Sequence, residues 1–263
     1  MDRITERFEK LKVQNEKAII PFLMGSMPNE NLSIECIVTA EKAGADIIEI
    51  GVPYSDPLAD GEVIEKVHHE GVKKGLNLPR IINFINKLRG YTDIPLVLFS
   101  YYNPVYRMGI KNFASACHDN GIDSVIIPDL PLEELLTIQE LGLSVIPLVA
   151  PSSSNKRLEI LSQFNSPFIY CVSIAGTTGV RDLDAKAISI YLNRVQKYTS
   201  SPLALGFGIS SPKQIKGLYE HADGFIIGSY LVNITDEYQH NPDEMLLTLG
   251  KTIRDLKYPE KNI

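Results

Sequence analysis

The chain has 263 residues, of which 44% are hydrophobic and 22% charged, and its formal net charge is −6. This is enough apolar material for one large core, and the length fits one or two domains. Lysine and arginine form no cluster in the sequence. Because binding to a phosphate backbone needs a basic patch, we expect no nucleic-acid partner.

The cysteines and the N-terminus indicate a cellular compartment. Cys36, Cys117 and Cys171 stand far apart and form no CxxC pair. This spacing is neither a disulfide framework nor a zinc motif, and it is typical of a reducing environment. Segment 1–12 is too charged for a signal peptide, and no apolar run approaches the roughly 18 residues of a membrane span. We therefore expect a cytoplasmic protein with no membrane association.

Eight short, β-branched apolar runs recur along the chain. They cover residues 18–24, 46–52, 95–101, 124–130, 144–150, 168–174, 202–208 and 224–230. Their hydrophobicity is nearly continuous rather than alternating, which is typical of strands buried on both faces of a parallel sheet. Amphipathic stretches between the runs predict helices, among them 32–43 and 109–120. Another helix is expected to begin at Pro212, after the suitable N-cap Ser211.

Strands that alternate with helices in this way predict one α/β domain over residues 1–263, a closed (β/α)8 (TIM) barrel. An open doubly wound sheet is the alternative, because the number of strands does not prove closure. The first strand is not followed by a glycine fingerprint, so a dinucleotide-binding domain has no support. Ile4, Phe8 and Leu11 recur at helical spacing, and we expect this extra N-terminal helix to plug the barrel floor.

Catalytic groups of a barrel lie at the C-terminal ends of its strands, and there Glu49 is conspicuous. It lies between Ile48 and Ile50 in an apolar strand, where alternation would point it into the barrel mouth. A buried carboxylate is costly unless it is paired or held neutral at a raised pKa. Asp60 follows in a loop that could fold over the same mouth, and two carboxylates in different settings suit complementary proton transfers. The alternatives are a structural carboxylate at 49 and an ordinary turn residue at 60.

Glycines at the ends of the last three predicted strands form a second group of candidate site residues. They occur in the segments 175–179, 206–208 and 228–229. Glycine lets backbone N–H groups approach a phosphate closely, and a helix beginning at Ser229 would add its dipole. The sequence therefore favours a substrate that carries a phosphate.

Several other chemistries lack the residues they need. No lysine lies at the C-terminal end of a predicted strand, which disfavours a Schiff-base aldolase. The five histidines fall in helical or tail segments, where we expect solvated side chains rather than metal ligands. The residues alone thus predict a metal-free enzyme that transfers protons on a small phosphorylated molecule.

Six segments together resemble the tryptophan synthase α subunit family. They are IIEIGVPYSDPLADG (47–61), LFSYYNP (98–104), IPDLPLEE (127–134), YCVSIAGTTG (170–179), LGFGIS (205–210) and DGFIIGS (223–229). The resemblance covers nearly the whole chain in order, and its first segment is highly specific. It implies retro-aldol cleavage of indole-3-glycerol phosphate to indole and glyceraldehyde 3-phosphate in tryptophan biosynthesis.

The resemblance also implies roles for individual residues. Glu49 would be the general acid–base, Asp60 would bind the indole N–H, and Tyr170 would line the site beside Glu49. The apolar pocket or its lid would comprise Phe22, Ile64, Phe99, Tyr101, Thr178 and Phe207. Phosphate would be bound by Gly179, Gly208, Gly228 and Ser229.

By the same resemblance, the loops 53–60 and 175–186 would close over the substrate and meet a β subunit. Pro53 and Asp56 match positions that help to make this contact. Indole would pass through a tunnel to that partner in an α₂β₂ complex. This chain would need no cofactor or metal, and pyridoxal phosphate would be held by the β partner.

The sequence departs from the family pattern at a few positions. Met27 replaces part of a Gly-Asp-Pro-type turn, Glu62 and the pair His68-His69 are unusual, and Ile174 stands where some relatives carry arginine.

Three alternative functions are compatible with the same motifs. They are a stand-alone indole-3-glycerol phosphate lyase, a catalytically silent subunit that activates a β partner, and another phosphate-binding barrel such as an isomerase.

Overall fold

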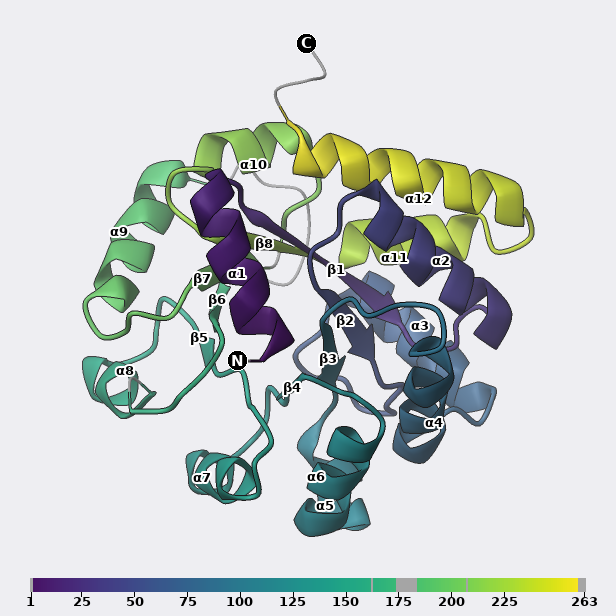
Figure 1. Ribbon diagram of the computed structural model, residues 1–263, viewed down its shortest axis with the longest axis horizontal. Coiled ribbons are helices and arrows are strands. Elements are labelled where there is room, and N and C mark those ends of the chain that lie inside the picture. The colour runs from purple at the N-terminus through teal and green to yellow at the C-terminus, as the bar shows by residue number, and fades with distance from the viewer. Residues whose placement is uncertain (1, 162, 174–183, 207, 260–263) are drawn as a thin grey trace.

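A computed structural model describes residues 2–161, 163–173, 184–206 and 208–259. Its strands are β1 (Ala18–Met24), β2 (Ile48–Gly51), β3 (Leu96–Phe99), β4 (Ser124–Ile126), β5 (Leu148–Val149), β6 (Ile169–Val172), β7 (Leu203–Gly206) and β8 (Gly224–Ile227). The helices are α1 (Arg3–Gln14), α2 (Glu30–Ala43), α3 (Glu62–Lys73), α4 (Leu78–Leu88), α5 (Tyr102–Met108), α6 (Ile110–Asp119), α7 (Leu132–Glu140), α8 (Asn155–Leu161), α9 (Ala185–Gln196), α10 (Pro212–Leu218), α11 (Ser229–Glu237) and α12 (Pro242–Lys257). The helices surround the strands (Figure 1).

The sheet is closed, which excludes the open alternative. The parallel strands follow the order β4-β3-β2-β1-β8-β7-β6-β5, so the first strand lies beside the last. A parallel bridge between Val125 and Val145 joins the two remaining edges. In this bridge the Val125 N–H donates to the Ser144 carbonyl at 3.0 Å, and the Ile146 N–H donates to the Val125 carbonyl at 2.9 Å. The expected (β/α)8 barrel is confirmed.

Alternation along each strand divides the core into two parts. In β1, Ile20 and Phe22 belong to a cluster inside the barrel, whereas Ile19 and Leu23 belong to the larger cluster between the sheet and the helices. Both faces of the strands are therefore buried, as their continuous hydrophobicity predicts. Most strands are shorter than their apolar runs: β1 fills the whole of its run, β4 only the first part, and β5 a part near the end.

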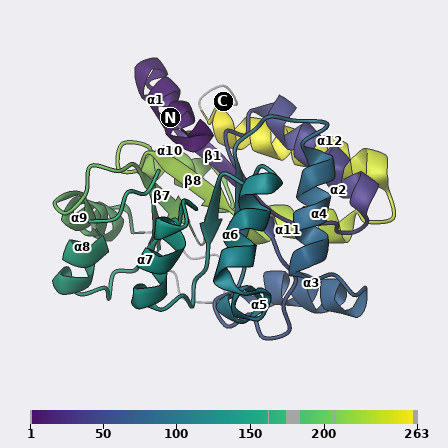
Figure 2. The same cartoon turned by 60° about the horizontal axis from the view of Figure 1, so that its bottom comes forward.

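Helix α1 closes one end of the barrel. Ile4, Phe8 and Leu11 are buried within the interior cluster, and the Phe8 ring lies 5.6 Å from that of Phe168, just before β6. Asp2 caps the helix by accepting hydrogen bonds from the first-turn backbone. Figure 2 shows α1 at one end of the molecule, with α3 and α5 toward the other. The barrel-floor prediction is confirmed, and the opposite end is left to the loops that follow the strands.

Candidate active site

Glu49 points into the barrel, as alternation predicts. It lies in β2 between Phe22 of β1 and Val97 of β3, and its residue is only 1% exposed. Its Oε1 makes no hydrogen bond in the described part of the chain. Burial raises the pKa of the Glu49 carboxyl well above its ordinary value, and the nearby charge of Asp60 raises it further. Burial thus favours the protonated form of this carboxyl, and one of its oxygens has no partner among the described residues.

Asp60 lies on the loop after β2, and its side chain is 4% exposed. The Tyr101 hydroxyl donates to Asp60 Oδ2 over 2.7 Å, and His68 Nε2 lies 3.2 Å from the same oxygen. Asp60 also contributes to the raised pKa of Glu49. The two carboxyl groups are thus in different settings, since Asp60 has hydrogen-bond donors and Glu49 Oε1 has none among the described residues.

His68 corrects the expectation that the histidines are solvated. Its side chain, in α3, is fully buried. Ile64, Val67 and Gly71 are buried on the same helix, and position 68 shares their face at i and i+4 spacing. The spacing of these residues was the signal that the sequence analysis missed. The Tyr54 backbone N–H donates to His68 Nδ1 at 3.0 Å, so this helix also holds the loop after β2.

Tyr170, in β6, is buried on the far side of the barrel from the loop after β2. Burial raises the pKa of its phenol well above the ordinary value, and the charges of Glu49 and Asp60 raise it further. A Cβ at Gly206, on the neighbouring strand β7, would overlap the Tyr170 hydroxyl. Glycine at 206 therefore makes room for this ring, and the charges of Glu49 and Asp60 both act on its hydroxyl.

Apolar and aromatic side chains wall the site. The rings of Phe22 and Phe99 meet edge to face with centroids 5.5 Å apart, and Tyr101 lies 6.3 Å from Phe99. Ile64 of α3 packs against the start of α11, because a Cβ at Gly228 would lie 3.2 Å from its Cδ1 atom. Four of the six expected pocket residues thus belong to the interior cluster. The other two, Thr178 and Phe207, lie outside the described residues.

The described glycines expected to bind phosphate follow β7 and β8, which are paired strands. Gly228 is the N-cap residue of α11, and this helix begins at the exposed Ser229. The first backbone N–H groups of a helix have no partner within it, so they are available to an anion. Gly208 adopts a φ of +77°, a backbone conformation in which any residue with a side chain would be strained. Gly179 lies outside the described residues.

The loop after β2 has one buried and one exposed predicted contact residue. Pro53 is buried and packs so closely on α3 that a Cβ at Gly71 would lie 2.6 Å from its Cγ. Asp56 is exposed and accepts a 2.5 Å hydrogen bond from the Ser55 hydroxyl. Leu58 is 93% exposed, which is unusual for so large an apolar side chain. Of the other expected loop, 175–186, only residues from 184 onward are described.

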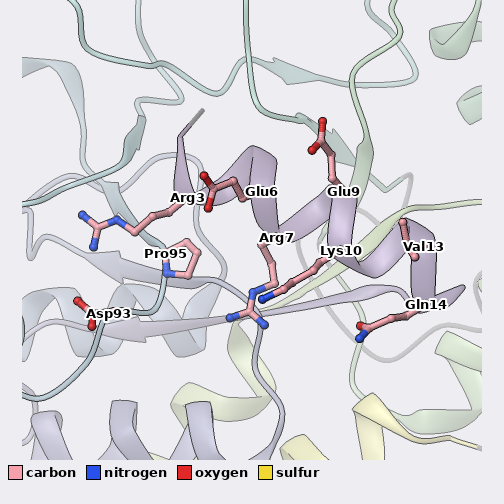
Figure 3. Close-up of a pocket in the computed structure, with 9 residues that line it drawn as sticks. All are labelled: Arg3, Glu6, Arg7, Glu9, Lys10, Val13, Gln14, Asp93 and Pro95. Carbon is pink, nitrogen blue, oxygen red and sulfur yellow. The ribbon is translucent and has the colours of Figure 1, made fainter.

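A groove of about 670 Å³ lies on the outer side of α1 (Figure 3). Its Arg3 pairs with Asp123 and its Arg7 with Asp46, residues that come just before β4 and β2. The groove is therefore at the N-terminal ends of the strands, opposite to Glu49 and Asp60.

Among the described residues, no group of three or more His, Cys, Asp or Glu side chains could hold a metal ion. No helix formed by the described residues has the length and hydropathy needed to cross a membrane.

Comparison with known proteins identifies the family. Residues 8–259 match the family model described as "Tryptophan synthase alpha chain". The chain belongs to the tryptophan synthase alpha chain family. It is 46% identical to the tryptophan synthase alpha chain of Syntrophomonas wolfei over 254 residues, which cover 97% of this chain and 98% of the relative. The fold and the family resemblance inferred from the sequence are confirmed.

Solved structures agree with this membership. The tryptophan synthase subunit alpha of Legionella pneumophila superposes with a TM-score of 0.91 at 29% identity, over all of both chains. A chain from a structure of the tryptophan synthase α₂β₂ complex of Pyrococcus furiosus superposes with a TM-score of 0.82 at 31% identity, covering 92% of this chain and 98% of that one. Membership in this family implies lyase activity.

Proposed function

We propose that this chain cleaves indole-3-glycerol phosphate to indole and glyceraldehyde 3-phosphate by general acid–base catalysis, without a metal ion or a cofactor of its own. The observation that carries the proposal is the buried carboxyl of Glu49. It has an oxygen without a hydrogen bond in the described part of the chain, and its pKa is raised well above the ordinary value. A raised pKa keeps more of the carboxyl protonated at a given pH, and a protonated carboxyl can act as a general acid.

The reaction requires two proton transfers and the cleavage of one carbon–carbon bond. Glu49 protonates C3 of the indole ring, and the resulting positive charge is shared with the ring nitrogen. The glycerol hydroxyl next to C3 then loses its proton to the Glu49 carboxylate. The electrons of that O–H bond form the aldehyde of glyceraldehyde 3-phosphate, and the pair of the broken C–C bond restores the aromatic ring.

Asp60 has the complementary role in this scheme. Its carboxylate accepts a hydrogen bond from the indole N–H and stabilises the positive charge of the protonated ring. Donors at 2.7 and 3.2 Å hold its Oδ2. These two hydrogen bonds hold the Asp60 carboxylate in place for this contact, whereas Glu49 Oε1 has no donor among the described residues.

The remaining site residues bind the substrate. Phe22, Ile64, Phe99 and Tyr101 surround the indole, and Tyr170 lies beside the reacting carbon. Gly208, Gly228 and Ser229 bind the phosphate at the N-terminus of α11. Thr178, Gly179 and Phe207 complete the pocket by family resemblance. The first N–H groups of a helix have no partner in the turn before them, and this supports placing the phosphate at the start of α11.

A product assay tests the reaction. Indole and glyceraldehyde 3-phosphate should form in equal amounts from indole-3-glycerol phosphate, and a metal chelator should leave the rate unchanged. Formation of neither product would refute the activity. A rate abolished by the chelator and restored by a divalent cation would refute metal independence.

We also propose that the chain forms an α₂β₂ complex with a tryptophan synthase β subunit, which binds pyridoxal phosphate and receives the indole. The solved α₂β₂ complex from Pyrococcus furiosus, at 31% identity, supports this partnership. The loop that carries Pro53 and Asp56 offers a fitting surface, because Leu58 at its tip is 93% exposed. The three cysteines are free and buried, which suits a cytoplasmic location. We propose that residues 1–263 act as one domain.

A further inference from the structure

The position of His68 suggests a role that the reaction scheme above does not assign. The side chain is fully buried in α3, and both of its ring nitrogens have partners in the loop after β2. Nδ1 lies 3.0 Å from the Tyr54 backbone nitrogen, and Nε2 lies 3.2 Å from Asp60 Oδ2. One imidazole therefore joins the start of the loop to its catalytic end.

The Tyr54 contact determines where the imidazole proton lies. A backbone N–H is always a donor, so His68 Nδ1 must be the acceptor in this hydrogen bond. A neutral imidazole carries its single proton on the other nitrogen, which here is Nε2. His68 therefore donates its Nε2–H to Asp60.

The Tyr101 hydroxyl is oriented in the same manner. It accepts the Ala59 backbone N–H at 3.0 Å, and its own proton points to Asp60 at 2.7 Å. Both donors therefore bond Asp60 Oδ2. Neither they nor any other described residue donates a hydrogen bond to Oδ1. Among the described residues, the carboxylate is therefore held through Oδ2, and Oδ1 has no donor.

We propose that His68 is a positioning residue for the cleavage reaction, whose neutral imidazole holds the Asp60 carboxylate so that Oδ1 accepts the indole N–H. This inference rests on the proposed function. It assigns the buried histidine of α3 to the orientation of a catalytic carboxylate. A purely structural histidine would act only through Tyr54, by attaching the loop to α3.

Two substitutions separate these roles, because each retains one ring nitrogen's function. His68→Asn places an amide oxygen near the position of Nδ1, so it keeps the acceptor for Tyr54 and loses the donor to Asp60. His68→Gln reaches the position of Nε2, so it keeps the donor to Asp60 and loses the acceptor. His69→Gln is the matched control, since His69 is the exposed neighbour on α3 and its Nε2 lies 3.1 Å from the Ser55 carbonyl.

The experiment compares kcat, KM and Tm of the three variants with those of the parent. We expect His68→Asn to lower kcat by about tenfold or more, which is the scale of one hydrogen bond to a charged group. His68→Gln and His69→Gln should stay within about threefold of the parent. Parental kcat in His68→Asn, or a greater loss in His68→Gln than in His68→Asn, would overturn the positioning role.

A second measurement does not depend on turnover. Nitrogen-15 NMR of the histidine rings should show His68 as a neutral imidazole protonated at Nε2, and Asp60→Asn should shift that Nε2 signal. A ring protonated at Nδ1, or on both nitrogens at neutral pH, would overturn the proposal. If the parent chain cleaves no substrate, the proposed function fails, and the NMR spectrum still decides whether His68 orients Asp60 in this way.

Discussion

The Tyr170 hydroxyl occupies the volume that a side chain at Gly206 would need. The two residues are on adjacent strands, β6 and β7, and a Cβ at position 206 would overlap the phenol oxygen. The ring is buried, so it cannot move aside without disturbing its neighbours. The absence of a side chain at 206 is therefore a condition for the position of Tyr170 beside Glu49.

Gly206→Ala should consequently displace Tyr170, lower the cleavage rate and destabilise the fold by about 1–3 kcal/mol, the usual cost of overpacking. Gly217→Ala is the matched control, because a Cβ there meets nothing within 4 Å in α10. Alanine in a helix is more favourable than glycine by about 0.5–1 kcal/mol, so this variant should be as active and slightly more stable. Equal Tm values and equal rates in the two variants would contradict the steric argument.

Glu49→Gln should stabilise the protein at neutral pH while reducing turnover by at least about a hundredfold. The ordinary pKa of a glutamate is 4.5, and that of Glu49 is raised well above it in the folded state. At a pH between the unfolded-state pKa and the folded-state pKa, the folded state therefore binds more protons than the unfolded state. Stability of the parent then falls as pH rises, by up to about 1.4 kcal/mol per pH unit from this group. Glutamine does not titrate and escapes this loss.

Denaturant unfolding of both proteins between pH 4 and pH 8 measures that difference. The free energy of unfolding of Glu49→Gln should exceed that of the parent by little near pH 4, and the difference should grow as pH rises. An advantage that stays constant or shrinks with rising pH would show that the Glu49 pKa is not raised in the folded state. Near-parental turnover of Glu49→Gln would remove this residue from the mechanism.

Asp60→Asn should reduce turnover severely and should also change its pH dependence. The negative charge of Asp60 helps to raise the pKa of Glu49, so removing that charge lowers the Glu49 pKa. Activity that needs protonated Glu49 should then decline at a lower pH than in the parent. The measurement is the pH profile of kcat for both proteins. A mild effect on rate, with an unshifted profile, would reduce Asp60 to a turn residue.

Lys257→Met should destabilise the barrel floor without altering catalysis. The ammonium of Lys257 bonds Asp46 Oδ2 at 2.9 Å and Glu16 Oε2 at 3.0 Å, and both the lysine and Asp46 are buried. Removing one partner of a buried pair leaves the other charge uncompensated and costs roughly 3–5 kcal/mol. The double variant Lys257→Met/Asp46→Asn should recover part of this loss in urea unfolding. A double variant less stable than Lys257→Met would contradict the pairing.

The features that could be predicted from the sequence are those set by residue spacing within one strand or one helix. Continuous apolar runs predict buried parallel strands, and alternation around Glu49 predicts its inward side chain. Helical spacing likewise predicts that Ile4, Phe8 and Leu11 plug the floor. These features depend on residues a few positions apart, where strand and helix geometry applies directly.

Contacts between distant segments were harder to predict. Closure of the barrel depends on the bridge between Val125 and Val145, which no run of apolar residues specifies. The burial of His68 follows from the apolar face of α3, but its hydrogen bond to Asp60 depends on how the intervening loop turns. A histidine in a helical segment is typically solvated, and here the loop from Tyr54 to Asp60 covers it.

The most direct test of the account is steady-state cleavage of indole-3-glycerol phosphate by the chain, with and without a cognate β subunit and with Glu49→Gln as the catalytic control. The account predicts weak cleavage by the chain alone, a strong rise when the β subunit is added, and a near-complete loss in Glu49→Gln. High activity that the β subunit leaves unchanged would indicate a stand-alone lyase instead. No cleavage by the parent chain under either condition would contradict the proposed function.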